Sequence, residues 1–258
     1  MNDIQYYLDT FEVSIPQLDR LTSIALAHGG DFADLYFEYT TFFNLLLKDG
    51  VVSAGGFHTD FGVGIRVLKG EKTGYAYSEN TAMEDMVKAA QAASAIALGA
   101  DSSRVYAAVA EKKEYYYPAE MNWRDMAADA FLPFIKELEK EIFSKDNRIV
   151  KVIIRLSDSV SDVMMYNSLG ELTVDSRPMG SVTVTAVFEQ DGKTENRSVS
   201  RSFRKGAEMI CEELRHELAE EVVRGIDARF EATRPKGGKM SVVMGAGASG
   251  ILLHEAMG

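Results

Sequence analysis

The chain has 258 residues, 46% of them hydrophobic and 26% charged, which suits one large soluble domain or two ordinary ones. Its 39 Asp and Glu outnumber 28 Lys and Arg, giving a net charge of −11. This acidity, without a basic stripe, excludes direct nucleic-acid binding as the expected function. Cys211 is the only cysteine and no signal-peptide pattern opens the chain, so we expect a cytoplasmic protein. No apolar run approaches the ~20 residues of a membrane-spanning helix, so no membrane association is expected.

The first 118 residues predict an α+β domain. Helical spacing of apolar residues favours helices over residues 15–28 and 81–97, the second opened by a capping box from Thr81 to Glu84. Short strands are predicted between them, at residues 34–39, 43–48, 51–54, 62–69 and 73–78. Asp49-Gly50 is a strong signal for a tight hairpin turn, and residues 55–60 are interpreted as a loop. The tyrosine run at residues 115–117, followed by Pro118, marks the expected boundary and is predicted to pack between domains.

Residues 119–233 predict a second α+β domain. A helix is expected from Asn122 to about residue 142, kinked or interrupted by Pro133, because proline lacks the N–H that would bond back one turn. Strands are predicted at residues 150–156, 162–166, 171–175, 181–190 and 196–203, with a turn at Asp191-Gly192. A long helix then carries apolar residues from Cys211 to Ile226. Both domains are expected to be antiparallel sheets with helices packed on one face.

Residues 234–258 are interpreted as a linker and the truncated start of a third domain. A lone strand at residues 240–244 leads into a glycine-rich turn at residues 245–250 and then an apolar helix start. The turn lacks the Lys-Ser/Thr of a phosphate-binding loop, so we assign it a structural role. A strand without a partner leaves its backbone unsatisfied, and we therefore expect this segment to be loose unless another chain supports it.

The helix start carries His254 and Glu255 directly after three apolar residues. Zinc peptidases commonly place a His-Glu pair on a helix, where the His binds the metal and the Glu activates the metal-bound water. The alternative interpretation is an ordinary His-Glu pair on the solvent-exposed face of a helix, without a metal. These residues alone do not decide between the two interpretations. The three other histidines, His28, His58 and His216, are poor candidates for a second ligand, and Cys211 is not assigned one.

Three motifs together resemble the TldD/PmbA family of metalloproteases, some of which are described as modulators of DNA gyrase. The C-terminal residues His-Glu-Ala-Met-Gly, at 254–258, match the family pattern His-Glu-x-x-x-His up to its last His. Residues 62–67 (Gly-Val-Gly-Ile-Arg-Val) with 70–77, and the turn at residues 167–172 (Asn-Ser-Leu-Gly-Glu-Leu), are the other matches. They occur in the family's order and span most of the chain.

The resemblance implies a zinc-dependent enzyme that cleaves unfolded peptides and pairs with a homologous subunit, as a homodimer or heterodimer. It makes His254 a zinc ligand and Glu255 the catalytic base. The 258-residue chain is expected to bind zinc weakly and to be inactive, since one His cannot hold catalytic zinc tightly. The alternative is a non-catalytic subunit that captures extended peptide as an added strand. The intact His254-Glu255 pair argues against it.

Overall fold

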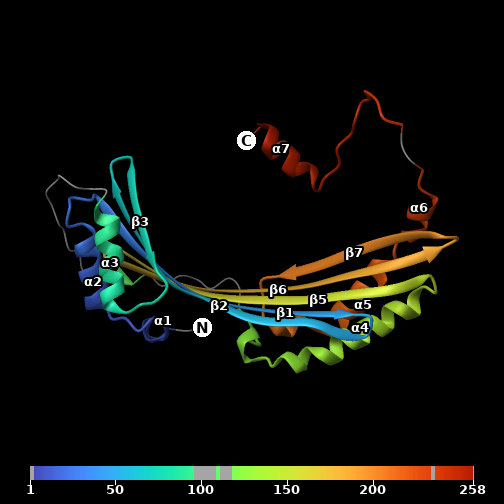
Figure 1. Ribbon diagram of the computed structural model, residues 1–258, viewed down its shortest axis with the longest axis horizontal. Coiled ribbons are helices and arrows are strands. Elements are labelled where there is room, and N and C mark those ends of the chain that lie inside the picture. The colour runs from blue at the N-terminus through green and yellow to red at the C-terminus, as the bar shows by residue number, and fades with distance from the viewer. Residues whose placement is uncertain (1–2, 96–108, 111–117, 234–235, 258) are drawn as a thin grey trace.

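The computed structural model describes residues 3–95, 109–110, 118–233 and 236–257 (Figure 1). Its described strands form one sheet in the order β3-β2-β1-β5-β6-β4, with β7 also paired to β6. The strands are β1 (Phe32–Lys48), β2 (Val51–Lys69), β3 (Lys72–Ser78), β4 (Val109–Ala110), β5 (Ile149–Asn167), β6 (Glu171–Gln190) and β7 (Lys193–Phe203). All pairs are antiparallel except β4 with β6. The α+β class is confirmed, but the expected two sheets are joined into one, because β1 pairs with β5 over its whole central length.

Four strands are longer than the sequence pattern indicates. The segment interpreted as a loop, residues 55–60, lies inside β2, where Gly56 pairs with Asn44 and His58 with Phe42. That interpretation was wrong because β1 provides a continuous partner even where β2 lacks large side chains. The two hairpin turns are confirmed: Asp49 and Gly50 have φ of 52° and 76°, as a two-residue turn with both central residues left-handed requires.

The described helices are α1 (Ile4–Thr10), α2 (Ile15–Ala25), α3 (Met83–Ser94), α4 (Leu132–Lys145), α5 (Glu212–Val223), α6 (Ile226–Glu231) and α7 (Ser249–Met257). All of them except α7 flank the sheet at its two ends. Pro133 does not kink a longer helix. It lies in the first turn of α4, where its missing N–H costs nothing, and short 3-10 turns at Trp123–Asp125 and Ala128–Phe131 precede it.

Two other helix expectations were also corrected. The helix expected to continue to Ile226 is divided at Gly225, whose φ of 71° ends α5 and starts α6. The capping box at Thr81 does not form; α3 begins after Ala82, whose N–H is held by the side chain of Asn80 at 3.0 Å. A box forms instead at α2, between Ser14 and Gln17.

Two hydrophobic cores lie on the same face of the sheet. In β1, Leu35 and Phe37 belong to the core under α1, α2 and α3, and Leu45 and Leu47 belong to the core under α4 and α5. All four have odd numbers, so strand alternation points them to one side. The opposite face of β6 and β7 carries a ladder of hydroxyls that includes the pair Thr183–Ser200. The sheet is therefore covered on one face, and Figure 1 shows α4 and α5 on its convex side.

The predicted domain limits at residues 118 and 233 stay predictions. The cores do not follow the first limit, since Tyr166 packs in the core of the N-terminal helices and Leu47 in that of α4 and α5. The tyrosines at residues 115–117, predicted to pack between domains, lie outside the described residues. The strand expected at residues 240–244 is not formed. Among the described helices, none is both long and apolar enough to span a bilayer.

Candidate functional site

Helix α7 carries both predicted site residues. Its first turn forms after the glycine-rich turn, where Gly247 has a φ of 138° and its carbonyl accepts from the N–H of Gly250 at 3.0 Å. The next bond, from the N–H of Ile251 to the carbonyl of Ala248 at 3.1 Å, continues the helix. Figure 1 shows α7 apart from the sheet, on the side opposite α4 and α5. All described residues from 236 to 257 are exposed except Ser249, which is half-buried.

His254 and Glu255 are neighbours in the last turn of α7, so their side chains leave the helix about 100° apart. Neither side chain has a hydrogen-bond or ion-pair partner among the described residues. The described part of the chain also contains no cluster of three His, Cys, Asp or Glu side chains able to hold a metal. Both side chains are therefore exposed to solvent, and no second metal ligand lies near them among the described residues.

The donor chemistry fits zinc, but the number of donors does not. A neutral imidazole is a common zinc ligand, and an adjacent carboxylate is suited to accept a proton from bound water. A catalytic zinc site needs three protein ligands, and the described residues around α7 supply His254 alone. The remaining ligands must come from elsewhere for these two residues to act.

The other histidines are engaged away from α7, as the sequence indicated. The Nδ1 atom of His28 is 3.0 Å from the hydroxyl of Ser94, and His58 stacks on Phe42 with ring centroids 4.4 Å apart. His216 lies between Glu141 and Glu212 on the helices α4 and α5. Cys211 is the residue immediately before α5.

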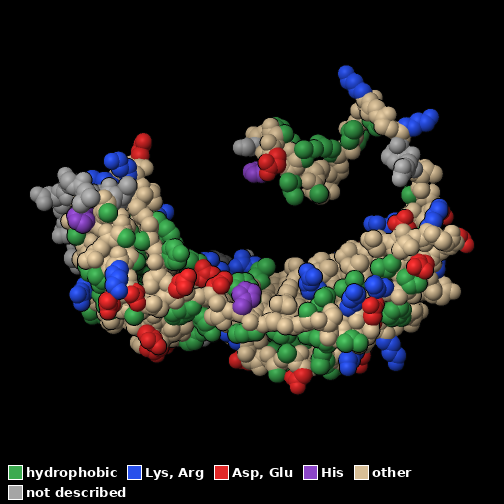
Figure 2. All heavy atoms as spheres, in the orientation of Figure 1, with side chains coloured by type: hydrophobic (Ala, Val, Ile, Leu, Met, Phe, Trp, Pro, Cys, Tyr) green, Lys and Arg blue, Asp and Glu red, His purple; other side chains and the backbone are tan. Residues whose placement is uncertain are grey.

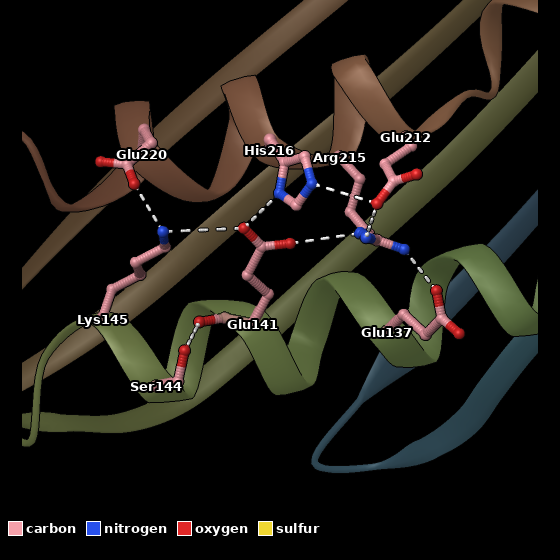
Figure 3. Close-up of polar contacts among 8 residues, drawn as sticks. All are labelled: Glu137, Glu141, Ser144, Lys145, Glu212, Arg215, His216 and Glu220. Atoms are coloured by element: carbon pink, nitrogen blue, oxygen red, sulfur yellow. Dashed lines mark hydrogen bonds and ion pairs between the residues drawn. The ribbon is translucent and has the colours of Figure 1, made fainter.

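A network of charges joins α4 to α5 (Figure 3). Glu141 accepts from Arg215 at 3.2 Å and lies 2.7 Å from Nδ1 of His216, and Lys145 bridges it to Glu220. Burial opposes ionisation of Glu141, but His216 and the neighbouring cations lower the pKa of this carboxyl overall. The hydrogen bond to Glu141 raises the pKa of His216. Because cations already occupy these carboxylates, the network is a contact between helices and not a metal site.

Two aspartates on the covered face of β5 were missed by the sequence analysis. Asp162 is fully buried: one carboxylate oxygen accepts from Arg124 and from the hydroxyl of Tyr6 at 2.8 Å, while the other has no partner. Asp158 is half-buried with no partner among the described residues, and burial raises its pKa to about 7. The signal was available, because both have even numbers in a strand whose core residues include Leu156, Val160 and Met164.

The family models assign the chain. Residues 33–97 match the model described as PmbA/TldA metallopeptidase domain 1, and residues 122–229 match that of the PmbA/TldA metallopeptidase central domain. The chain belongs to the PmbA/TldD family. His254 and Glu255 lie after the second matched segment. The predicted resemblance is confirmed, and with it a metallopeptidase relationship.

Curated relatives agree with this assignment. A metalloprotease TldD homolog of Haemophilus influenzae is 30% identical over 240 residues, which cover 88% of this chain and 49% of that protein. One from Buchnera aphidicola subsp. Schizaphis graminum is 25% identical, covering 90% of this chain and 49% of that protein. The chain therefore spans about half the length of these relatives.

Solved structures share the fold. A proposed modulator of a DNA gyrase from Thermotoga maritima superposes with a TM-score of 0.64 at 22% identity, covering 81% of this chain and 47% of that one. TldE from Thermococcus kodakarensis gives a TM-score of 0.64 at 13% identity, covering 82% and 47%. At these identities the likeness concerns the fold alone.

Proposed function

We propose that the chain provides the first half of a zinc-dependent peptidase, with His254 as a zinc ligand and Glu255 as the general base. One observation carries the proposal: a member of a metallopeptidase family presents adjacent imidazole and carboxylate groups on the exposed helix α7. The other ligands would come from residues outside those described. When bound, zinc would polarise the peptide carbonyl and acidify a water molecule.

Glu255 would take the proton of the attacking water and pass it to the leaving amine. An exposed carboxylate next to the ligand can reach a water that the ligand helps to hold, and it must be ionised to accept the proton. His254 must be neutral to bind metal, so protonating it in acid would release zinc. These two requirements favour activity near neutral pH.

The apolar surface of α7 supports a role inside a larger assembly. Ile251, Leu252 and Leu253 are each more than half exposed, and Met257 is 80% exposed. Figure 2 shows hydrophobic side chains spread over this helix. A nine-residue apolar helix is unstable alone in water, so we propose that other parts of the protein or a homologous subunit cover it. The named TldE structure makes a TldD/TldE-like partner the natural candidate.

The proposed substrate is unfolded peptide in the cytoplasm, without direct nucleic-acid binding. The net charge of −11 supports the second part, because an acidic protein repels phosphate backbones. A fluorescent single-stranded DNA titrated with the protein at low salt checks it, and saturable binding would contradict it.

Zinc titration tests the ligand assignment directly. Residues 1–258 alone should bind zinc weakly, with a dissociation constant above about 1 µM, because they offer one donor. Stoichiometric binding at sub-micromolar affinity that disappears in His254→Ala would show that the chain contains the remaining ligands. His28→Ala is the matched control and should leave zinc binding unchanged.

The base is tested in a polypeptide that continues past Gly258 and completes the site. There Glu255→Gln should keep its zinc content but lose ~10²–10⁴-fold in peptide cleavage, because Gln cannot take a proton. Near-normal turnover would remove Glu255 from the mechanism. Tight peptide binding in a protein that holds no zinc would support the non-catalytic alternative.

A further inference from the structure

Strand β2 has a free edge over its first half. One side of β2 pairs with β1 throughout, but β3 pairs with the other side only from Val63 to Lys69. Among the described strands, none pairs with the outer side of residues 51–62. Residues 51–60 are all exposed, including Phe57 at 66%. Their outward N–H and C=O groups are therefore open to a further strand.

This edge lacks the features that keep strand edges from pairing. Natural edges are protected by charged side chains, proline or a covering element. Residues 51–59 contain no charged residue and no proline, and Gly55 and Gly56 at their centre leave the backbone accessible. The charged residue of the free edge is Asp60, near its end. The β7 edge differs, since Arg197 on β7 bonds to the carbonyl of Glu221 on α5 at 3.0 Å, and Arg229 bonds to the carbonyl of Asn196 at 3.0 Å.

We propose that this edge pairs with the same edge of a second copy of the chain, antiparallel and with Gly56 opposite Gly56. The length of the free edge supports this register. It begins after the turn at Asp49-Gly50 and ends where β3 joins at Val63. Centring the pair on Gly56 sets residue 51 opposite residue 61. The two free segments then pair along their whole length without overlapping β3.

The side chains suit this register. Phe57 would face Gly55 of the second copy, and His58 would face its Ala54, so that each large side chain meets a small one. Aromatic rings placed across from edge glycines shield the backbone and help to fix register. Asp60 of each copy would lie opposite Val52 of the other, at opposite ends of the paired segment, so the two-fold axis brings no like charges together. A sheet continuous through two copies would result.

The inference specifies a surface for a homologous subunit in the case that this subunit is a second copy of the chain, and it rests on that part of the proposed function. It does not involve zinc, because β2 carries neither His254 nor Glu255. The competing occupant of the same edge is an extended peptide that adds to it as a strand. The second copy is favoured because, across residues 54–58 of the two copies, large side chains lie opposite small ones.

Cysteine cross-linking tests the register in a Cys211→Ser background. Gly56→Cys should form a disulfide between two copies under mild oxidation, because directly opposed residues of antiparallel strands have Cα atoms about 4.5–5.5 Å apart. Ala54→Cys alone should not, since the two copies of residue 54 would lie ~13 Å apart at ~3.3 Å per residue. Mixing Ala54→Cys with His58→Cys should restore the cross-link as a mixed dimer.

Analytical ultracentrifugation over a concentration series tests the contact without oxidation. Phe57→Lys should weaken dimerisation about tenfold or more, because it places a charge at the centre of the edge. Tyr75→Lys, which changes an exposed aromatic residue on β3, is the matched control and should leave it unchanged.

Three outcomes would overturn the proposal. A monomer at all concentrations would remove both the edge pairing and the homodimer. A dimer that is insensitive to Phe57→Lys and forms no Gly56→Cys cross-link would show that the chain dimerises through another surface. Binding of an unstructured peptide that is lost in Phe57→Lys, without self-association, would assign the edge to peptide.

Discussion

Arg124 and Asp162 form an ion pair between the two cores, and it joins three parts of the chain. Arg124 lies in the 3-10 turn before α4, and Asp162 lies in β5. The guanidinium also donates to the carbonyls of Val160 at 2.8 Å and Tyr39 at 3.1 Å, and it stacks 4.5 Å from the Tyr39 ring centroid. The hydroxyl of Tyr6, from α1, completes the contact. The buried carboxylate of Asp162 thus connects α1, which packs in one core, to the turn before α4, which packs in the other.

Removing Arg124 should therefore destabilise the whole fold. Arg124→Leu leaves the carboxylate of Asp162 buried without its cation, which typically costs ~3–5 kcal/mol. Urea unfolding followed by circular dichroism measures the loss. Arg155→Leu, at an exposed position of β5, is the control and should change the free energy of unfolding by less than ~0.5 kcal/mol. An effect of Arg124→Leu no larger than this control would mean that the ion pair does not stabilise the fold.

Asp158 should make the protein less stable as the pH rises. Its folded pKa of about 7 exceeds the ~3.9 of an unfolded chain, so the folded state binds the extra proton between these values. The free energy of unfolding should fall from about pH 4 to pH 7, and Asp158→Asn should remove that part of the fall. Thermal unfolding at pH 4.5 and pH 7.5 compares the two proteins, with Glu189→Gln at an exposed position of β6 as control. An equal gain from Asp158→Asn at both pH values would show that Asp158 does not titrate in this range.

His216 should stabilise the contact between α4 and α5 in its charged form. Its pKa is raised by Glu141, so its contribution is present below the ordinary value of ~6.5 and is lost as the pH rises through the folded pKa. An NMR titration of the imidazole should give a pKa above ~6.5 that moves down in Glu141→Gln. His216→Gln should lower the melting temperature more at pH 5.5 than at pH 8.5. A pKa unmoved by Glu141→Gln would contradict the pairing.

Gly180 should not tolerate a methyl group. An added Cβ would collide with ring atoms of Trp123 and Phe203, which lie over this position of β6. Overpacking of this kind typically costs ~1–3 kcal/mol, so Gly180→Ala should lower the urea midpoint accordingly. In Gly55→Ala the added Cβ would be 3.5 Å from Leu45, an ordinary contact, and stability should change little. Equal effects of the two substitutions would mean that the rings over Gly180 move aside freely.

Limited trypsin digestion should remove the C-terminal segment first. Residues 236–248 form neither helix nor strand, and α7 buries no residue. Cleavage should concentrate after Lys236 and Lys239, because trypsin does not cut the bond between Arg234 and Pro235, and it should leave a body of about residues 1–236. Protection of these sites in a demonstrated monomer would mean that the segment packs on the body.

Local chemistry explains which elements the sequence predicts correctly. Asp49-Gly50 and Asp191-Gly192 favour left-handed backbone by themselves, and the helix of residues 15–25 shows its apolar stripe directly. The long strands are different. Gly55-Gly56 in β2 and Ser157-Asp158-Ser159 in β5 lack an apolar alternation. Pairing with β1 keeps the first segment extended, and pairing with β1 and β6 keeps the second extended. The β1–β5 pairing joins residues more than a hundred positions apart, such as Asn44 and Ser157, which no local pattern contains.

The candidate site likewise has local features, which the sequence predicts, and long-range contacts, which it does not. The His254-Glu255 pair is a local motif, and its helix is confirmed, while its roles in metal binding and catalysis stay predictions. The ion pair of Asp162 was missed because its partner lies 38 residues away in a short turn. A charged residue at a buried position of a strand pattern is the signal that could have found it.

The shared side of the two cores constrains insertions in the chain. Strands β1, β5 and β6 each run without a break from one core to the other, and each contributes residues of one parity to both, apart from Ile149 before the register shift at the start of β5. A single residue inserted between the cores, for example after Thr41, would turn Leu45 and Leu47 to solvent unless a bulge absorbed it. Length changes in the middle of these strands should therefore be accepted in pairs of residues, while the hairpin turns at their ends can change by one.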